Sequence, residues 1–256
     1  MAWDIVGRRF SDDDFATYVD GLSLSRWKPD FIVLHNTAVP SLAQRPNGFT
    51  PQHIQNLHGF YLGKGWSGCP HLFVDQNGIW VLNPLTRKGV HSPSWNAVAW
   101  GIEMLGEYGS EPFDTGPGAM VRANAVSALA TLCKKGGFAA DTIRFHKEDP
   151  KTTHTTCPGK NVRKDQVIEA VRKAMQPPAA SDAKLVIYRQ GMGDQPAAVI
   201  PAELRGGAAH ASSAAMSSAT GIPSDEDRMV SVRSFLGSRY SLKWVAESRK
   251  VFAVEK

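Results

Sequence analysis

Hydrophobic and polar positions near the start of the chain follow first the period of a helix and then the pattern of a strand. Phe15 and Val19 recur at helical spacing behind Ser11, which is typical of a helix N-cap because an acidic residue follows it three positions later. The unbroken apolar run at residues 31–34 predicts a buried strand that ends at His35. We therefore expect a short amphipathic helix before the first strand of a sheet.

A threonine-proline pair at residues 50–51 predicts the start of a second helix, since proline suits the first helical position. Ile54 and Tyr61 recur at helical spacing and are expected to face the core. His53 and His58 fall elsewhere on this helix, so we expect them in solvent.

Two further segments have strand-like patterns. Residues 71–83 alternate around Asn77-Gly78, a strong signal for a tight hairpin whose flanking apolar runs pair. Residues 97–105 predict another strand, which contains Glu103 among apolar and small residues. An acid in such a strand costs stability unless it has a partner or a function, so Glu103 is a candidate functional residue.

The next segments continue the alternation of helix and strand. Apolar positions at residues 121–132, followed by two lysines and Gly136-Gly137, predict a helix with a cationic last turn and a glycine C-cap. Residues 142–145 predict a strand, and residues 162–175 predict a helix that ends before two prolines. We expect an α/β (α+β) domain over residues 1–176, with a central mixed β-sheet flanked by helices.

The composition changes after this domain. Residues 177–183 are rich in proline and alanine and predict a linker, and the Ala/Ser/Gly-rich stretch 206–221 predicts a mobile loop. Short β-like runs surround that stretch, so we expect a small C-terminal αβ module at residues 184–256. The runs lie at residues 185–188, 229–233, 241–244 and 250–254.

Charge, cysteine content and the start of the chain narrow the class of protein. A formal net charge of +5 favours contact with polyanions, but the sequence has no basic stripe of the nucleic-acid type, so nucleic acid is not expected as a partner. Three cysteines in 256 residues make no disulfide framework. With neither a signal peptide nor a transmembrane segment in the sequence, we expect synthesis in the cytoplasm.

The polar segment 144–160 is crowded with potential metal ligands. Imidazole and thiolate groups hold zinc, and a catalytic zinc site uses three protein ligands and keeps a fourth position open. His146 and Cys157 could supply two ligands, and His35, held at a strand end, is the best upstream candidate for the third. Their spacing fits no close-paired structural zinc pattern, so a zinc finger is not expected.

Five ordered motifs lie between Trp27 and Met175. They are residues 31–38, residues 70–78, His91 with Trp95-Asn96, residues 100–103, and His146 with residues 155–159. In this order the motifs resemble those of the zinc-dependent N-acetylmuramoyl-L-alanine amidases, which include amidase-type phage lysins and are related to the peptidoglycan recognition proteins. The resemblance implies that His35, His146 and Cys157 bind Zn²⁺, which lowers the pKa of a bound water to about 7 and polarises the amide carbonyl.

The same resemblance implies roles for other residues. Glu103 stands in a Gly-Ile-Glu motif where such amidases place a general base, with a salt-bridged structural acid as the alternative. Thr155 stands where many lytic members carry a catalytic lysine. Without that lysine, the oxyanion would be stabilised by Thr155, His154 or Lys151. Pro70 stands where many lytic members carry a tyrosine just before the histidine of the hairpin. The residues expected at the substrate are His91, Trp95, Asn36 and His154, with a loop-structuring role as the alternative for His91.

These inferences predict a peptidoglycan hydrolase that cleaves the amide bond between N-acetylmuramic acid and L-alanine, with Zn²⁺ as its cofactor. The absence of a signal peptide favours a monomeric phage endolysin that reaches the cell wall after release, in the periplasm or from outside. There are two alternatives: a cytoplasmic muropeptide-recycling amidase and a non-catalytic peptidoglycan-binding module. Cys157 favours catalysis over binding alone, because non-catalytic recognition proteins typically replace that ligand. The C-terminal module is loosely similar to stalk modules of cell-wall enzymes, which implies cell-wall binding; a stabilising extension is the alternative.

Overall fold

The computed structural model describes residues 3–176, 184–188, 197–205, 208–224, 229–237, 240–245 and 250–255. The predicted linker at residues 177–183 lies outside the described residues. The chain forms two compact units, Met1–Gln176 and Pro177–Lys256, and each is described by itself.

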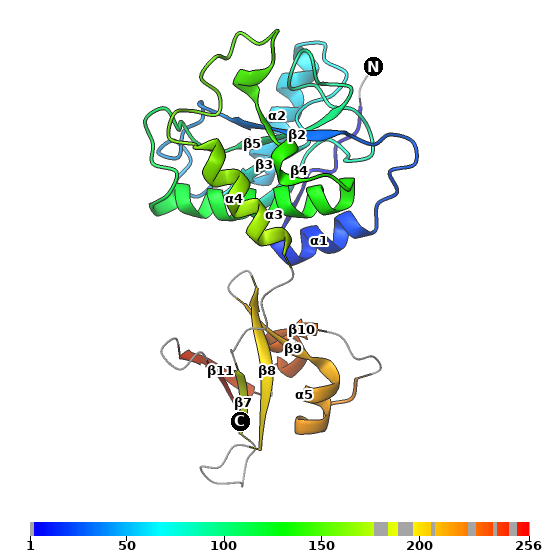
Figure 1. The fold of residues 1–256 in the computed structure, drawn as a ribbon, viewed down its shortest axis with the longest axis vertical. Coiled ribbons are helices and arrows are strands. Elements are labelled where there is room, and N and C mark those ends of the chain that lie inside the picture. Colours follow the sequence, from blue (N-terminus) through cyan, green and yellow to red (C-terminus); the bar gives the residue numbers. More distant parts are fainter. Residues whose placement is uncertain are drawn as a thin grey trace. The chain divides into compact units, whose positions relative to one another are not determined.

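The first unit is built on a six-stranded mixed sheet (Figure 1), as the sequence predicts. Across the sheet the strands follow the order β1 (Arg8–Phe10), β4 (Gly78–Val81), β3 (Leu72–Asp75), β5 (Ala99–Met104), β2 (Phe31–Asn36) and β6 (Arg144–Phe145). The pairs β1–β4 and β4–β3 are antiparallel, whereas β3, β5, β2 and β6 run parallel to one another. The predicted α/β class with a central mixed sheet is confirmed.

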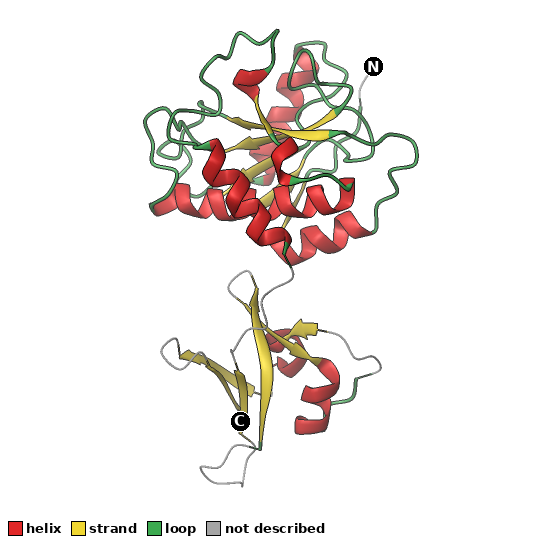
Figure 2. Cartoon of the chain, in the orientation of Figure 1, coloured by secondary structure: helices red, strands yellow, loops and turns green. Residues whose placement is uncertain are grey.

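Helices cover both faces of this sheet (Figures 1 and 2). Three of them lie on one side: α1 (Asp12–Asp20), α3 (Gly116–Gly136) and α4 (Lys164–Met175). The helix α2 (Pro51–Gly63) lies on the other side. The helix α3 packs on strands β2 to β5, because its apolar positions, among them Val121 and Leu129, are fully buried.

The helix ends are set by local hydrogen bonds. The hydroxyl of Ser11 accepts from the backbone N–H of Asp14, and Thr50 accepts from that of His53. Gly137 adopts a left-handed φ of 72° at the end of α3. The expectation that His53 and His58 lie in solvent holds only in part. Both are partly exposed, but His53 Nδ1 accepts from the N–H of Thr50 and His58 packs edge-on against Trp3.

The tight turn of the β3–β4 hairpin lies one residue earlier than predicted, at Gln76-Asn77. The carboxylate of Asp75 accepts from the N–H groups of Asn77 (2.7 Å) and Phe49 (2.6 Å), which fixes the turn there. Gly78 belongs to β4, where a Cβ atom would approach the carbonyl oxygen of Phe10 to 2.5 Å.

The strand predicted at residues 142–145 is also shorter, since only Arg144–Phe145 pairs with β2. Ala140–Thr142 forms a 3₁₀ turn instead. The hydroxyl of Thr142 donates to the carbonyl of Ala139, and this local bond competes with extended pairing.

The second unit contains its own six-stranded sheet, in which β7 and β12 are parallel and the other pairs antiparallel. The strand order is β10 (Met229–Ser231), β9 (Ala208–Ser212), β8 (Ala198–Arg205), β7 (Lys184–Tyr188), β12 (Lys250–Glu255) and β11 (Tyr240–Val245). The unit also has two helices, α5 (Ser213–Thr220) and α6 (Val232–Leu236). The β-like run predicted at residues 229–233 therefore divides into the three-residue strand β10 and the start of α6.

The stretch 206–221 is not the mobile loop that its composition predicts, because its described residues form β9 and α5. Ala211 and Met216 are buried in a cluster with Leu185, and Ser212 caps α5 by accepting from the N–H of Ala215. Burial of small side chains thus orders a segment whose composition is typical of a linker. No helix in the described part of the chain has the length and apolar character needed to cross a bilayer.

Candidate metal centre and active site

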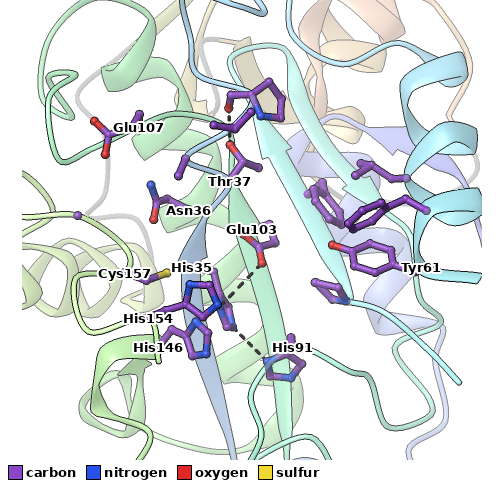
Figure 3. A pocket seen from close by; sticks show the side chains of 18 of the residues that line it. His35, Asn36, Thr37, Tyr61, His91, Glu103, Glu107, His146, His154 and Cys157 are labelled. Carbon is purple, nitrogen blue, oxygen red and sulfur yellow. Dashed lines mark hydrogen bonds and ion pairs between the residues drawn. The ribbon is translucent and has the colours of Figure 1, made fainter. Parts of the chain in front are cut away.

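Strand pairing brings two histidines together at one edge of the first sheet (Figure 3). In the parallel β2–β6 pair Leu34 lies opposite Phe145, so the next residues, His35 and His146, emerge side by side with ring centroids 4.4 Å apart. Cys157 approaches them from the loop that follows. One ligand atom from each of His35, His146 and Cys157 lies within 4.8 Å of the other two. The structure therefore brings together the three residues predicted as metal ligands.

The Cys157 loop is held by backbone contacts to both neighbouring segments. The N–H of Lys147 donates to the Cys157 carbonyl at 3.0 Å, and the N–H of Asn36 donates to its sulfur. Gly159 follows with φ of 105°, where a Cβ atom would come within 2.4 Å of the Tyr108 backbone. These contacts fix the position of the sulfur.

A chain of hydrogen bonds determines which nitrogen of His35 carries the proton. His91 Nε2 lies 3.1 Å from the carbonyl oxygen of Ala99, which can only accept, so His91 Nδ1 holds the lone pair. That nitrogen is 3.1 Å from His35 Nε2, which must therefore donate (Figure 3). His35 Nδ1 is left unprotonated, with its lone pair available to a metal.

Burial keeps the imidazoles neutral. Desolvation lowers the pKa of His35 well below its usual value and that of His146 to about 4, with neighbouring histidines acting in the same direction. His146 Nε2 lies 2.9 Å from the Thr152 hydroxyl, so Nδ1 is its ring nitrogen available to a metal. Neutral imidazole is the form that coordinates metals.

The Cys157 thiol completes a donor set that suits zinc. Burial, with the Glu103 carboxylate nearby, raises the pKa of Cys157 to about 12, whereas the Asn36 amide and the Lys147 ammonium act in the opposite direction. A bound cation would favour the thiolate, since a metal deprotonates a coordinating thiol. Two neutral imidazoles and one cysteine, all held from the backbone, fit Zn²⁺.

Glu103 faces the same site from the middle of the sheet. In the parallel β2–β5 pair it lies opposite His35, and its Oε1 is 3.9 Å from His35 Nδ1 (Figure 3). Burial raises the pKa of Glu103 to about 8. A carboxyl whose pKa lies near neutral pH is suited to accept and return a proton in catalysis.

A cavity of about 480 Å³ opens onto these residues. One wall comes from the end of α2 and the residues after it: Phe60, Tyr61, Lys64 and Trp66. Val39, which is 78% exposed, belongs to the segment that lines another part of the cavity. Tyr61 belongs to the buried core, as the sequence predicts, and it also borders the cavity. The sequence analysis did not predict this wall, although aromatic residues and a lysine grouped at one helix end were a signal for it.

Of four further residues predicted at the site, two line the cavity and two do not. Asn36 and His154 line the cavity. Each is also held by a contact within the protein: the Asn36 amide donates to the Gly106 carbonyl, and His154 stacks on His146 with ring centroids 5.2 Å apart. Thr155 is exposed and is not part of the lining, which contains Thr156 instead. Trp95 also lies outside the lining, because its ring packs on Phe31 and under the Arg144 guanidinium.

His91 and Pro70 also line the cavity, but both ring nitrogens of His91 bond within the protein. Its backbone N–H donates to Asn96 Oδ1 at 2.6 Å, which ties His91 to its loop. Three hydrogen bonds therefore fix the position and orientation of His91 at the cavity.

Asp149 is a buried acid that the sequence did not single out. Its carboxylate accepts from the Ser92 hydroxyl (2.5 Å) and from the N–H groups of Ser94 (2.9 Å) and Lys151 (2.8 Å). Burial acts to raise the pKa of Asp149, but these hydrogen bonds outweigh it and lower the pKa to about 2. Asp149 thereby joins the His91 loop to the loop that carries His146 and Cys157.

Comparison with known proteins bears on this site. A family model described as N-acetylmuramoyl-L-alanine amidase matches residues 25–160, more than half of the chain. A search of curated proteins finds no match. The matched range contains His35, Glu103, His146 and Cys157.

Solved structures with a similar fold come from several sources. The endolysin N-acetylmuramoyl-L-alanine amidase LysCS from Clostridium intestinale is 26% identical with a TM-score of 0.46, over 57% of this chain and 86% of that one. The catalytic domain of XlyA is 23% identical with a TM-score of 0.44, over 56% and 86%. Drosophila PGRP-LB is 19% identical with a TM-score of 0.43, over 59% and 88%. On the family match over residues 25–160, the chain belongs to the N-acetylmuramoyl-L-alanine amidase family.

Proposed function

We propose that this protein is a zinc-dependent peptidoglycan amidase that cleaves between N-acetylmuramic acid and L-alanine. The observation that carries the proposal is the convergence of His35, His146 and Cys157, with ligand atoms within 4.8 Å of one another, beside the carboxyl of Glu103. Family membership supports the amide substrate, and the retained cysteine supports catalysis over binding alone.

The metal would be held by His35 Nδ1, His146 Nδ1 and the Cys157 sulfur. Zinc bound there supplies a Lewis acid and a water of lowered pKa. His91 acts on this site by accepting from His35 Nε2, which keeps the His35 lone pair on Nδ1.

Glu103 is the proposed general base. Two acidic side chains line the cavity, Glu103 and Glu107, and it is Glu103 whose Oε1 lies 3.9 Å from His35 Nδ1. It would take a proton from the attacking water and return it to the leaving amine. For stabilising the oxyanion His154 is a better candidate than Thr155, because His154 lines the cavity and Thr155 does not. Of the three residues expected from the sequence, Thr155, His154 and Lys151, the proposal therefore favours His154.

The aromatic wall formed by Phe60, Tyr61 and Trp66 would exclude water from one side of the scissile bond. Phe60 is 55% exposed and Trp66 37% exposed, so both retain surface that a glycan or peptide can cover. We propose an endolysin-like role, in which the enzyme acts on intact cell wall rather than on recycled muropeptides.

Digestion of purified sacculi tests this function. We expect new L-alanine amino termini without new reducing sugars, loss of activity with a chelator, and recovery on addition of Zn²⁺. Cys157→Ser should lower zinc content, because a hydroxyl is a poor zinc ligand compared with thiolate. New reducing ends would identify a glycosidase, binding without cleavage would identify a recognition module, and cleavage restricted to soluble muropeptides would favour the recycling alternative.

A further inference from the structure

A second hollow of about 690 Å³ lies in the first unit, and it shares no lining residue with the catalytic cavity. It forms between the segment after α1 and the loop after β4. Its lining contains three cations, Arg26, Arg87 and Lys88. The other lining residues are three hydroxyl side chains, Ser23, Ser25 and Thr86, and the aromatic Trp27.

The charge of this hollow is positive and uncompensated. No acidic residue lines it, and none of its three cations forms an ion pair within the described part of the chain. Arg26 and Lys88 are exposed. Grouped cations without a carboxylate attract anions, and guanidinium groups suit phosphate because they donate two parallel hydrogen bonds.

Part of the hollow is rigid. Arg87 donates from Nε to Asn83 (3.2 Å) and from Nη2 to the Asp4 carbonyl (2.6 Å), and it lies over the Trp3 ring. Trp27 donates from its indole nitrogen to the Ala97 carbonyl at 2.8 Å. A preorganised site loses less entropy when a ligand binds.

The Trp27 ring is fixed on one side by His71, with parallel planes and centroids 5.6 Å apart. His71 is itself held, since Nε2 lies 2.9 Å from the Arg87 carbonyl and Nδ1 accepts from the N–H of Gly101. A half-buried aromatic ring beside hydroxyl groups suits a ligand with both C–H and O–H groups, such as a sugar or a sugar alcohol.

We propose that this hollow binds a phosphate ester of a sugar or sugar alcohol, the unit that repeats in phosphate-bearing polymers of the cell envelope. The cations and hydroxyl groups bind the phosphate, and Trp27 contacts the carbon skeleton. Binding there holds the enzyme on the wall without occupying the catalytic cavity. This inference goes beyond the proposed amidase function and does not depend on the metal.

Titration of the full-length protein with glycerol 3-phosphate, followed by ¹⁵N NMR, tests the site. The reporter is the Trp27 indole N–H, assigned with Trp27→Phe. We expect saturable shifts of this signal and of the amides at residues 23–27 and 86–88, with no shift from glycerol or from sodium chloride at equal ionic strength. Equal shifts with sodium chloride would overturn the proposal.

The double variant Arg26→Gln/Lys88→Gln should weaken this binding by about tenfold or more, since it removes two charge-assisted contacts. Arg9→Gln/Lys173→Gln is the matched control, because it removes the same net charge from exposed positions outside the hollow. An equal loss in the control would mean that net charge alone attracts the anion, and the proposed site would be wrong.

Cosedimentation with sacculi tests the polymer. The bound fraction should fall when phosphate-bearing polymers are stripped from the wall and, on intact wall, in Arg26→Gln/Lys88→Gln. Cleavage of soluble muropeptides should stay unchanged, which separates this site from the amidase function. Unchanged sedimentation on stripped sacculi, or binding only to vesicles of anionic phospholipid, would overturn the assignment to a wall polymer.

Discussion

Individual side chains in this site acquire their chemistry from their neighbours. The carboxyls of Glu103 and Asp149 have opposite pKa shifts: burial raises that of Glu103 to about 8, whereas three hydrogen bonds lower that of Asp149 to about 2. A residue type read from the sequence cannot distinguish these states, because the burial of Glu103 and the hydrogen bond from Ser92 to Asp149 both arise from tertiary packing.

The role of Glu103 can be tested by Glu103→Gln, which keeps size and hydrogen bonding but removes proton acceptance. We expect zinc content and folding to be retained while turnover falls by about 10²–10⁴, the usual contribution of a general base. Elemental analysis and the rate of L-alanine release measure the two effects. Turnover near the wild-type value with zinc bound would assign the base to another group, and His154 would be the next residue to change.

Asp149→Asn tests whether that acid stabilises the active-site loops. We expect a loss of about 2 kcal/mol in the free energy of unfolding at pH 7, because charge-assisted hydrogen bonds are lost. The folded-state pKa of Asp149 is lowered, so its contribution is present above pH 4 and disappears as the pH falls toward 2. The wild type and Asp149→Asn should therefore differ less in their free energy of unfolding at pH 2.5 than at pH 7, as measured by urea unfolding at both pH values. Asp114→Asn, at an exposed position, should show no such difference.

At the scale of elements, the central strand β5 organises the site through alternation. Ala99, Gly101 and Glu103 share one face, as the sequence predicts. Ala99 accepts from His91 through its carbonyl, Gly101 leaves room for the His91 ring, and Glu103 faces His35. The spacing of these residues along one strand therefore sets the spacing of the catalytic groups.

Gly101→Ala tests this arrangement. A Cβ atom there would lie 2.4 Å from Cγ of His91, whose ring is held by hydrogen bonds at both nitrogens. We expect a loss of about 1–3 kcal/mol in unfolding free energy from overpacking, together with weaker zinc binding as His91 leaves His35. Thermal unfolding and metal titration measure these effects.

Gly59→Ala is the matched control, because nothing lies within 4 Å of a Cβ atom at that position in α2. Alanine should raise stability there by about 0.5–1 kcal/mol, since glycine disfavours a helix interior. If Gly101→Ala were as stable as Gly59→Ala and bound zinc normally, His91 would not depend on the space at Gly101.

At the scale of the whole molecule, each unit has its own core. Among the residues that the structure describes, the buried cluster of the first unit runs from Trp3 to Val171, and that of the second runs from Leu185 to Tyr240. Separate cores are typical of segments that fold independently. We propose that the second unit is a cell-wall binding module attached to the amidase unit.

A chain ending at Gln176 tests this division. We expect it to unfold cooperatively and to cleave soluble muropeptides at the rate of the full protein, because the whole catalytic cavity lies within the first unit. Its retention on sacculi stripped of phosphate-bearing polymers should be lower than that of the full chain. Aggregation of the shortened chain would instead show that residues 177–256 are a stabilising extension of the amidase unit.

The local pattern of the sequence predicted most helices and strands of the first unit, though not β1, and it selected the residues proposed as metal ligands. Helix caps at Ser11 and Thr50 depend on neighbouring residues, so they could be predicted. The ligand set could be predicted because imidazole and thiolate groups are rare enough, and the motifs specific enough, to select His35, His146 and Cys157.

Only the tertiary structure decided which residues face the cavity and which state each one adopts. The cavity lining includes Thr156 rather than Thr155, and it includes the aromatic wall at the end of α2. Composition likewise failed at residues 206–221, where burial of Ala211 and Met216 orders the chain. The physical reason is the same in each case: burial, pKa and tautomer depend on contacts between residues far apart in sequence, and local periodicity carries no information about those contacts.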